Sequence, residues 1–206
     1  MQGKFIVLEG IDGSGKSWQA KLLVGYLFDK AKNNHVFLTR EPYDSPYLAD
    51  IRRILKESKD PALHAVELAE LFVKDRKVHA EIIKRHLAEG THVICDRYKH
   101  STLAYQRTQG IAIEKLLAMH EGVLVPDLTL LFDVPAKIAQ ARLGADKTRP
   151  YHEVFEIEAF QEKIRQNFLQ LPNYLLGERM VVLDGTGSPE VVFGLMKAEV
   201  DMLFIK

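Results

Sequence analysis

The apolar positions of the chain fall into short unbroken runs, separated by longer stretches with a helical repeat. The runs lie at residues 5–8, 36–38, 93–95, 128–132 and 180–183. None alternates with polar residues, which is typical of strands buried on both faces of a parallel sheet. Helical patterns lie between the runs, for example at residues 19–32, 63–89 and 154–171. This alternation predicts an α/β fold of three layers, with a five-stranded parallel sheet between two layers of helices.

Two stretches interrupt this pattern and are predicted to be loops. One is residues 41–46, which are rich in Pro and turn-forming residues. The other is residues 144–152, which contain Asp146, Lys147, Arg149 and Pro150. In sheets of this kind, ligands bind at loops that follow the carboxyl ends of the strands. Since no linker, repeat or low-complexity segment divides the sequence, we expect residues 1–206 to form a single domain.

The first apolar run leads into a motif for binding phosphate. Residues 10–17 match G-x-x-x-x-G-K-[ST], and a helical stretch follows, as a phosphate-binding loop requires. Glycines let successive backbone N–H groups face a phosphate, and the helix adds its positive end. We expect Lys16 to reach the terminal phosphates and Ser17 to bind Mg²⁺. The predicted triphosphate contacts of the loop are Gly10, Ile11, Asp12, Gly13, Ser14, Gly15, Lys16 and Ser17.

This motif predicts the P-loop NTPase form of the α/β fold, which GTPases, ATPases and kinases share. A second pair of candidate residues, Asp96 and Arg97, follows the third apolar run. A carboxylate at the end of a strand beside the P-loop strand is placed to hold water on Mg²⁺. The planar fork of Arg97 can grip a second phosphate. An ordinary surface ion pair is the alternative interpretation of these two residues.

Composition limits the classes of partner. The 206 residues include 28 Lys+Arg and 28 Asp+Glu, so the formal net charge is zero. This argues against a general nucleic-acid coat protein, because such proteins carry a basic excess. The single cysteine, Cys95, rules out an internal disulfide and a Cys-rich zinc site. Apolar runs are too short for a membrane span or a signal peptide, so we expect a cytosolic protein with no membrane partner.

Three further segments carry a resemblance to a known family. Residues 96–106 resemble the D-R-[YH]-x-x-S-x-x-A-Y-Q signature of thymidylate kinases. Residues 39–42 resemble that family's T-R-E-P loop, and residues 71–76 its L-F-x-x-x-R helix. The similarity runs from residue 5 to about residue 155. It implies a kinase that transfers the γ-phosphate of ATP to dTMP, giving dTDP and ADP in dTTP synthesis, with Mg²⁺ as cofactor and a homodimeric assembly.

The resemblance also implies roles on the acceptor side. Phe72 would stack on the thymine ring, and Arg76, four residues later on the same helix face, would bond its carbonyl edge. Without the resemblance, the pattern favours an ordinary core aromatic for Phe72 and an exposed helix charge for Arg76. The other implied dTMP contacts are Thr102 and Gln106 at the base, Arg97 and Arg52 at the phosphate, Tyr105 and Asp12 at the sugar, Glu41 near the sugar and metal, and Pro42, Ser101 and Tyr151 in the same site.

Residues 142–151 resemble the lid that closes over ATP in this fold, and we expect the lid at about residues 143–152. A lid supplies cations and excludes water, which would otherwise accept the phosphate. Some family members carry a catalytic arginine inside the P-loop, where this chain has Gly13 and Ser14. We therefore expect the arginine to come from the lid. The predicted catalytic set is Lys16, Arg97, Asp96, Asp12 and Arg149, with Arg142 as the second choice for the lid cation and an ATP contact; Ser17 and Asp96 form the metal site.

Two rival functions remain open from the sequence. A kinase of another monophosphate or of an unphosphorylated deoxynucleoside shares most of these motifs, and Glu41 could then act as the carboxylate base. A nucleotide-dependent switch without transferase activity is the second rival, although the N-K-x-D motif that reads guanine is absent. Trp18 stands where the family usually has Thr or Ser, and we expect it to have a packing role.

Overall fold

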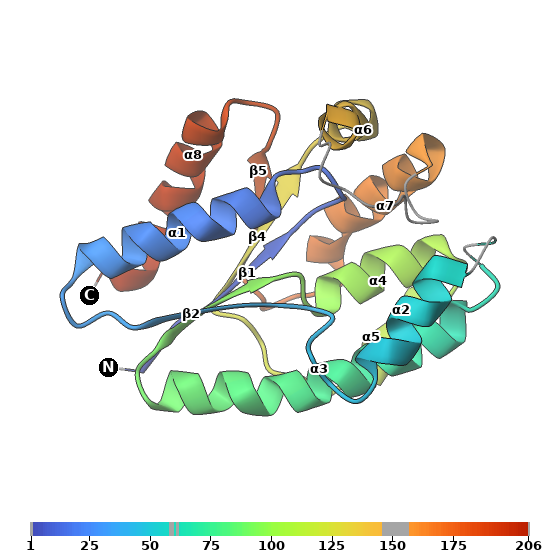
Figure 1. Cartoon of the computed structure of the whole chain (residues 1–206), viewed down its shortest axis with the longest axis horizontal. Coiled ribbons are helices and arrows are strands. Elements are labelled where there is room, and N and C mark those ends of the chain that lie inside the picture. The colour runs from blue at the N-terminus through green and yellow to red at the C-terminus, as the bar shows by residue number, and fades with distance from the viewer. Residues whose placement is uncertain (1, 58–59, 61, 146–156, 206) are drawn as a thin grey trace.

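The computed structural model describes residues 2–57, 60, 62–145 and 157–205 (Figure 1). The strands are β1 (Phe5–Glu9), β2 (Val36–Arg40), β3 (His92–Asp96), β4 (Leu128–Asp133) and β5 (Met180–Asp184). The helices are α1 (Lys16–Lys30), α2 (Leu48–Glu57), α3 (Ala65–Ala88), α4 (Lys99–Thr108), α5 (Ile113–Met119), α6 (Ala136–Ala145), α7 (Glu158–Gln170) and α8 (Pro189–Asp201), with the 3-10 turns η2 (Leu171–Asn173) and η3 (Met202–Phe204).

The five strands form one parallel sheet in the order β2-β3-β1-β4-β5. β1 is central, with Ile6 aligned to Ile94 of β3 on one side and to Leu128 of β4 on the other. Every residue of β1 and β3 is buried, as the unbroken apolar runs indicate. The predicted five-stranded α/β fold is therefore confirmed.

Alternate residues of β1 face the two helical layers (Figure 1). Ile6 and Leu8 belong to a core cluster with side chains of α1 and α8. Phe5 and Val7 point the other way, into a cluster that includes side chains of α3. A third cluster joins α3, α4, α5 and α7. None of the described helices carries the long apolar stretch that a membrane span would need.

Some element boundaries differ from those predicted. α1 starts three residues earlier, at Lys16, because the helix begins directly at the phosphate loop. Residues 144 and 145, predicted as loop and lid, are the last two residues of α6. The predicted loop began at Gly144, but a helix tolerates an isolated glycine at a modest cost. Residues 146–152 of the predicted lid, and residues 154–156 of the predicted helix before α7, lie outside the described residues.

The topology determines where a ligand can bind. The chain leaves β1 toward α1, and the neighbouring strands β3 and β4 lie on opposite sides of β1. In open parallel sheets, the crevice outside the carboxyl ends of the strands at such a switch point is the usual ligand site. The phosphate loop follows β1 and the Asp96–Arg97 pair follows β3, so both lie at this edge.

Candidate active site

The phosphate loop between β1 and α1 has the curled backbone that its glycines allow. Gly13 has φ 81°, and a Cβ there would lie 2.3 Å from the carbonyl oxygen of Ala139 in α6. Only glycine fits this close approach. Gly15, the N-cap of α1, also has positive φ and makes no side-chain capping bond. The loop therefore ends at a helix N-terminus suited to an anion.

Lys16 is folded back over this loop. Its Nζ donates hydrogen bonds to the carbonyl oxygen of Ile11 at 2.7 Å and to Ser14 Oγ at 3.3 Å. The side chain is buried, and this burial, together with the nearby Arg97 cation, lowers the pKa of Lys16 to about 8. A cation held at the centre of a phosphate-binding loop is placed to meet the charge of a triphosphate.

Ser17 and Asp96 meet at the junction of α1 and β3. The Ser17 hydroxyl donates to Asp96 Oδ2 at 2.5 Å. A hydroxyl and a carboxylate are oxygen ligands of the kind that Mg²⁺ prefers, usually together with water and substrate phosphates. Among the described residues, no group of three or more His, Cys, Asp or Glu side chains could hold a metal by itself. The pair fits a Mg²⁺ ion that a bound nucleotide helps to hold.

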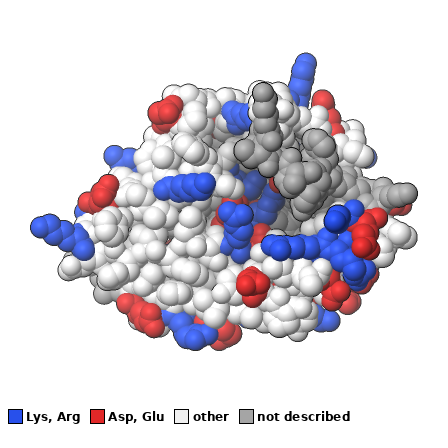
Figure 2. Space-filling view, in the orientation of Figure 1, with Lys and Arg blue, Asp and Glu red and all other residues white. Residues whose placement is uncertain are grey.

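A cavity of about 390 Å³ opens beside the phosphate loop, at Asp12. Its walls include Asp12 and every described residue that was predicted to contact dTMP, namely Glu41, Pro42, Arg52, Phe72, Arg76, Arg97, Ser101, Thr102, Tyr105 and Gln106. Tyr151 lies outside the described residues. The walls also include Arg40, Leu55 and Tyr98, which were not predicted. Figure 2 shows Lys and Arg side chains gathered near the middle of the visible face, with acidic groups among them.

Arg97 lines this cavity and contacts the phosphate loop. Its Nη2 is paired with Asp12 Oδ1 at 2.5 Å, and its Nη1 donates to Ser101 Oγ at 3.1 Å. Tyr105 Oη donates to the other oxygen of Asp12 at 3.0 Å. Burial opposes ionisation of Asp12, but the Arg97 and Lys16 cations prevail and lower its pKa to about 2. Asp12 is therefore an anion that orients the arginine.

Arg76 also lines the cavity and is almost wholly buried, at 1% exposed. Its Nε donates to Glu41 Oε2 at 2.7 Å and its Nη2 donates to Thr102 Oγ1 at 3.2 Å. Nη1 donates to His120 Nε2 at 2.6 Å, while His120 Nδ1 donates to the Leu116 carbonyl oxygen. Burial and the Arg76 cation lower the pKa of His120 to about 3, so this imidazole is neutral. The interpretation of Arg76 as an exposed helix charge is wrong.

The carboxylate of Glu41 is buried and accepts hydrogen bonds from neighbouring side chains. Besides Arg76, its carboxylate accepts from His79 Nδ1 at 3.1 Å, and its side chain is 3% exposed. The Glu41 carboxylate thus contacts both the guanidinium of Arg76 and the imidazole of His79. A carboxylate in this arrangement positions Arg76, and it is poorly placed to abstract a proton from a substrate hydroxyl.

The cavity wall also contains an aromatic ring and buried polar atoms without hydrogen-bond partners among the described residues. Phe72 is half-buried and lines the wall, so it is not an ordinary core residue. The buried atoms Tyr98 Oη and Gln106 Oε1 have no hydrogen-bond partner among the described residues. Leaving such groups unpaired costs about 1–3 kcal/mol each. A flat ligand with polar edges would pack on Phe72 and could pair these atoms.

The donor side is described only in part. Arg142, in the last turn of α6, donates to the carbonyl oxygens of Gly185 and Thr186 at 2.9 and 3.0 Å. Arg149 lies outside the described residues. Trp18 is on the first turn of α1 and is 57% exposed, so the packing role expected for it is wrong. Nothing in the sequence pattern indicated this exposure, because the first turn of a helix after a phosphate loop has no fixed buried face.

Comparison with known proteins adds to this geometry. Residues 8–194 match the family model described as thymidylate kinase. A probable thymidylate kinase of Pyrococcus horikoshii is 42% identical over 185 residues, covering 88% of each chain. A probable thymidylate kinase of Thermococcus kodakarensis is 35% identical, covering 97% of this chain and 98% of that protein. A thymidylate kinase of Carboxydothermus hydrogenoformans is 37% identical, covering 96% of both. The chain belongs to the thymidylate kinase family.

Proposed function

We propose that the protein transfers the γ-phosphate of ATP to dTMP, giving dTDP and ADP, as a cytoplasmic step of dTTP synthesis. One observation carries this proposal. A single cavity is lined both by Arg97, which pairs with Asp12 of the phosphate loop, and by Phe72 and Arg76 of α3. Arg97 suits a phosphate, and Phe72 with Arg76 suits a flat base with a carbonyl edge. Family membership supports the same acceptor.

In this mechanism, the rate of phosphoryl transfer depends mainly on the positioning of the substrates and on charge neutralisation. Arg97, helped by Arg52, holds the phosphate of dTMP with one oxygen facing the triphosphate on the loop. That oxygen is already ionised, so no general base is needed. Lys16 neutralises charge that develops on the transferred group. Ser17 and Asp96 would hold Mg²⁺, which neutralises triphosphate charge when bound.

The remaining cation comes from the lid. Arg142 is fixed to two backbone carbonyls of the segment after β5, which suits it to anchoring the end of α6. This supports Arg149 as the residue that reaches the transferred phosphate. Replacing Arg149 with Ala should lower kcat by about 100-fold, as removal of a transition-state cation typically does. The same change at Arg142 should lower it much less. The reverse order of effects would move the role to Arg142.

A coupled ADP-release assay with ATP and Mg²⁺ tests the acceptor. The panel is dTMP, dUMP, dCMP, dGMP and thymidine, with a no-acceptor control. We expect dTMP to give the highest kcat/KM. Turnover of thymidine with none of dTMP would support a nucleoside kinase, although Glu41, its candidate base, is tied to Arg76 and His79. Nucleotide binding with no acceptor-dependent ADP release would support a switch.

We also propose the homodimer that the family resemblance implies. The outer surface of α3 carries exposed apolar side chains, including Val66 and Val78, at 44% and 39% exposed. Apolar side chains of this kind are often covered by a partner subunit. Light scattering on the purified protein should give twice the mass of one chain. A monomer at micromolar concentration would contradict the proposal.

A further inference from the structure

The backbone of Arg97 is strained and is pinned on both sides by the end of β1. Arg97 has φ 73°, in the left-handed region that side chains other than glycine avoid at a cost of about 1–2 kcal/mol. The Arg97 N–H donates to the carbonyl oxygen of Leu8 at 3.0 Å. The next amide, that of Tyr98, donates to Glu9 Oε1 at 2.7 Å. Two consecutive residues of β1 therefore hold this conformation in place.

Glu9 also reaches the side chain of Arg97 through one intermediate, Ser101. Glu9 Oε1 accepts from the Ser101 amide at 3.2 Å, and Glu9 Oε2 accepts from the Ser101 hydroxyl at 2.7 Å. The same hydroxyl accepts from Arg97 Nη1. Glu9 thus bonds the first turn of α4 as a capping carboxylate would, although it comes from another element. A carboxylate, a hydroxyl and a guanidinium form one continuous chain.

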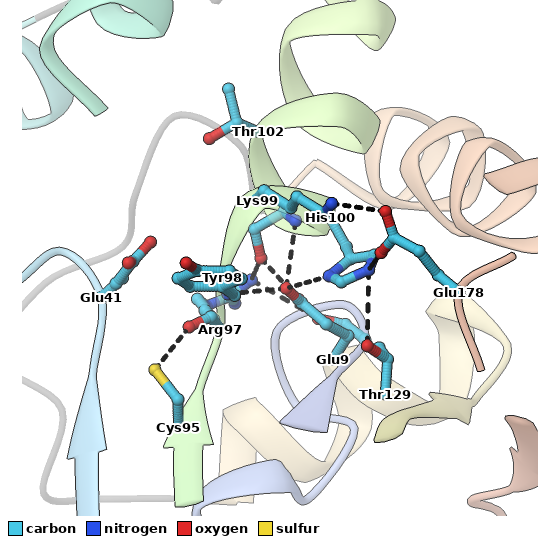
Figure 3. Close-up of polar contacts among 12 residues, drawn as sticks. Glu9, Glu41, Cys95, Arg97, Tyr98, Lys99, His100, Thr102, Thr129 and Glu178 are labelled. Carbon is cyan, nitrogen blue, oxygen red and sulfur yellow. Dashed lines mark hydrogen bonds and ion pairs between the residues drawn. The ribbon is translucent and has the colours of Figure 1, made fainter. Parts of the chain in front are cut away.

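A buried group of charges surrounds this carboxylate. Glu9 is fully buried, and His100 Nδ1 lies 3.7 Å from its Oε1. On the far side of the imidazole, His100 Nε2 lies 3.5 Å from Glu178 Oε2, and Lys99 Nζ pairs with Glu178 Oε1 at 2.5 Å (Figure 3). Burial raises the pKa of Glu9, while His100, Arg97 and the bonds from Ser101 and Tyr98 act against that rise. The residues that hydrogen-bond Glu9 thus also favour the ionised form of its carboxylate.

We propose that Glu9 is a positioning residue for the acceptor phosphate: it never touches the substrate, and it holds Arg97 in place through the Tyr98 amide and the Ser101 hydroxyl. The proposal rests on the proposed role of Arg97 at the phosphate of dTMP. Glu9 lies before the phosphate loop, on the donor side of the sequence motif, yet its hydrogen bonds go to Tyr98 and Ser101, which line the acceptor cavity. Its loss should therefore weaken acceptor binding and spare ATP.

The variant Glu9→Gln tests this with almost no change in shape. An amide NH₂ cannot accept from the Ser101 hydroxyl, so that hydroxyl must turn and its proton would then compete with Arg97. We expect the KM for dTMP and its calorimetric Kd without ATP to rise about tenfold, the loss of one hydrogen bond to a charged group. The KM for ATP should stay within about twofold.

Asp127→Asn is a matched control, because Asp127 precedes β4 and bonds the first residue of β1, at the opposite end from Glu9. Asp127 accepts from the Phe5 amide at 2.8 Å and pairs with Lys4, so it too is a carboxylate that pins β1. It has no contact with the acceptor cavity. This variant should lower Tm as Glu9→Gln does, with both KM values unchanged. A merely structural role for Glu9 would make the two variants alike.

A pair of variants at Ser101 keeps the proposal testable if Glu9→Gln folds poorly. Ser101→Ala removes the intermediate hydroxyl and should raise the KM for dTMP, whereas Ser101→Thr should restore it. The double variant Glu9→Gln/Ser101→Ala should raise the KM for dTMP no further than the more strongly affected single variant does. Both substitutions break the same chain of hydrogen bonds, so their effects should not add. Fully additive effects would overturn the proposal, as would a KM for ATP that rises equally. Absence of dTMP turnover in the wild type would instead refute the proposed function.

Discussion

Arg97 and Asp12 form an ion pair between the turn after β3 and the phosphate loop, with Nη2 and Oδ1 2.5 Å apart. Both side chains are partly exposed, at 19% and 25%. Tyr105 bonds the second oxygen of Asp12, so the carboxylate itself is held in place. The arginine is therefore oriented before any substrate arrives, and under the proposed function an acceptor phosphate would meet a cation that has little freedom left to lose.

This pairing predicts that Arg97 cannot be replaced by lysine. Lys keeps the charge but lacks the planar fork needed to bond Asp12, Ser101 and a phosphate together. We expect Arg97→Lys to lower kcat/KM for dTMP about 100-fold and to leave the KM for ATP within about threefold. Arg107→Lys is the control, because the half-buried Arg107 of α4 bonds Tyr174 and does not line the cavity; it should leave both KM values unchanged. An equal loss for both substrates would remove Arg97 from the acceptor site.

Lys16→Ala should reduce turnover severely without unfolding the protein. The side chain bonds only atoms of the loop itself, Ile11 O and Ser14 Oγ, among the contacts described. Its loss removes the charge that a transferred phosphate meets, and we expect kcat to fall by about 1,000-fold or more. Steady-state kinetics and a thermal melt measure the two effects. Nearly intact activity would show that the phosphate-loop assignment is wrong.

Donor-nucleotide affinity should depend on pH through Lys16. Its pKa in the free protein is lowered to about 8, and a bound di- or triphosphate must raise it again by charge attraction. Affinity for ADP is thus full below about pH 8 and weakens as pH rises from 8 toward the higher bound-state pKa. Calorimetry between pH 7 and 10 should show this loss together with proton uptake on binding near pH 8. The variant Lys16→Met should lose the pH dependence; its persistence there would contradict the assignment.

Arg76→Ala should raise the KM for dTMP far more than that for ATP. It should also lower the free energy of unfolding by about 3–5 kcal/mol, because it leaves the buried carboxylate of Glu41 without its main cation. The double variant Arg76→Met/Glu41→Gln separates these effects. It should recover much of the stability, measured by urea unfolding, and none of the dTMP affinity. Recovery of both, or equal effects on the two KM values, would exclude Arg76 from the acceptor site.

Local patterns were sufficient to predict the sheet and the phosphate loop. The strands are unbroken apolar runs, and the loop motif depends on residues that are adjacent in the chain, so a short window contains the signal. The cavity lining was predicted from the resemblance of residues 39–42, 71–76 and 96–106 to a known family, together with Asp12 of the phosphate loop and Arg52. That all its described members share one cavity depends on the strand order, which places β1 beside β3.

Contacts between distant segments could not be predicted in this way. Glu9 follows four apolar residues and reads as the polar end of a strand, although its carboxylate reaches Tyr98 and Ser101 about ninety positions later. The sequence did not indicate that His120 accepts a hydrogen bond from Arg76, because a lone histidine after a short helix has no distinctive pattern. Tyr98 and Arg40 lie inside the segments that resemble the family's motifs, and their place in the cavity wall was missed because cavity walls are set by packing.

The central claim is that one cavity holds a pyrimidine monophosphate with its base on Phe72 and its phosphate on Arg97. A crystal structure with dTMP and a non-hydrolysable ATP analogue tests it most directly. We predict the thymine ring stacked on Phe72 within reach of Arg76, and the monophosphate bonded by Arg97 and facing the triphosphate on the loop. Density for dTMP elsewhere, with this cavity empty, would contradict the account.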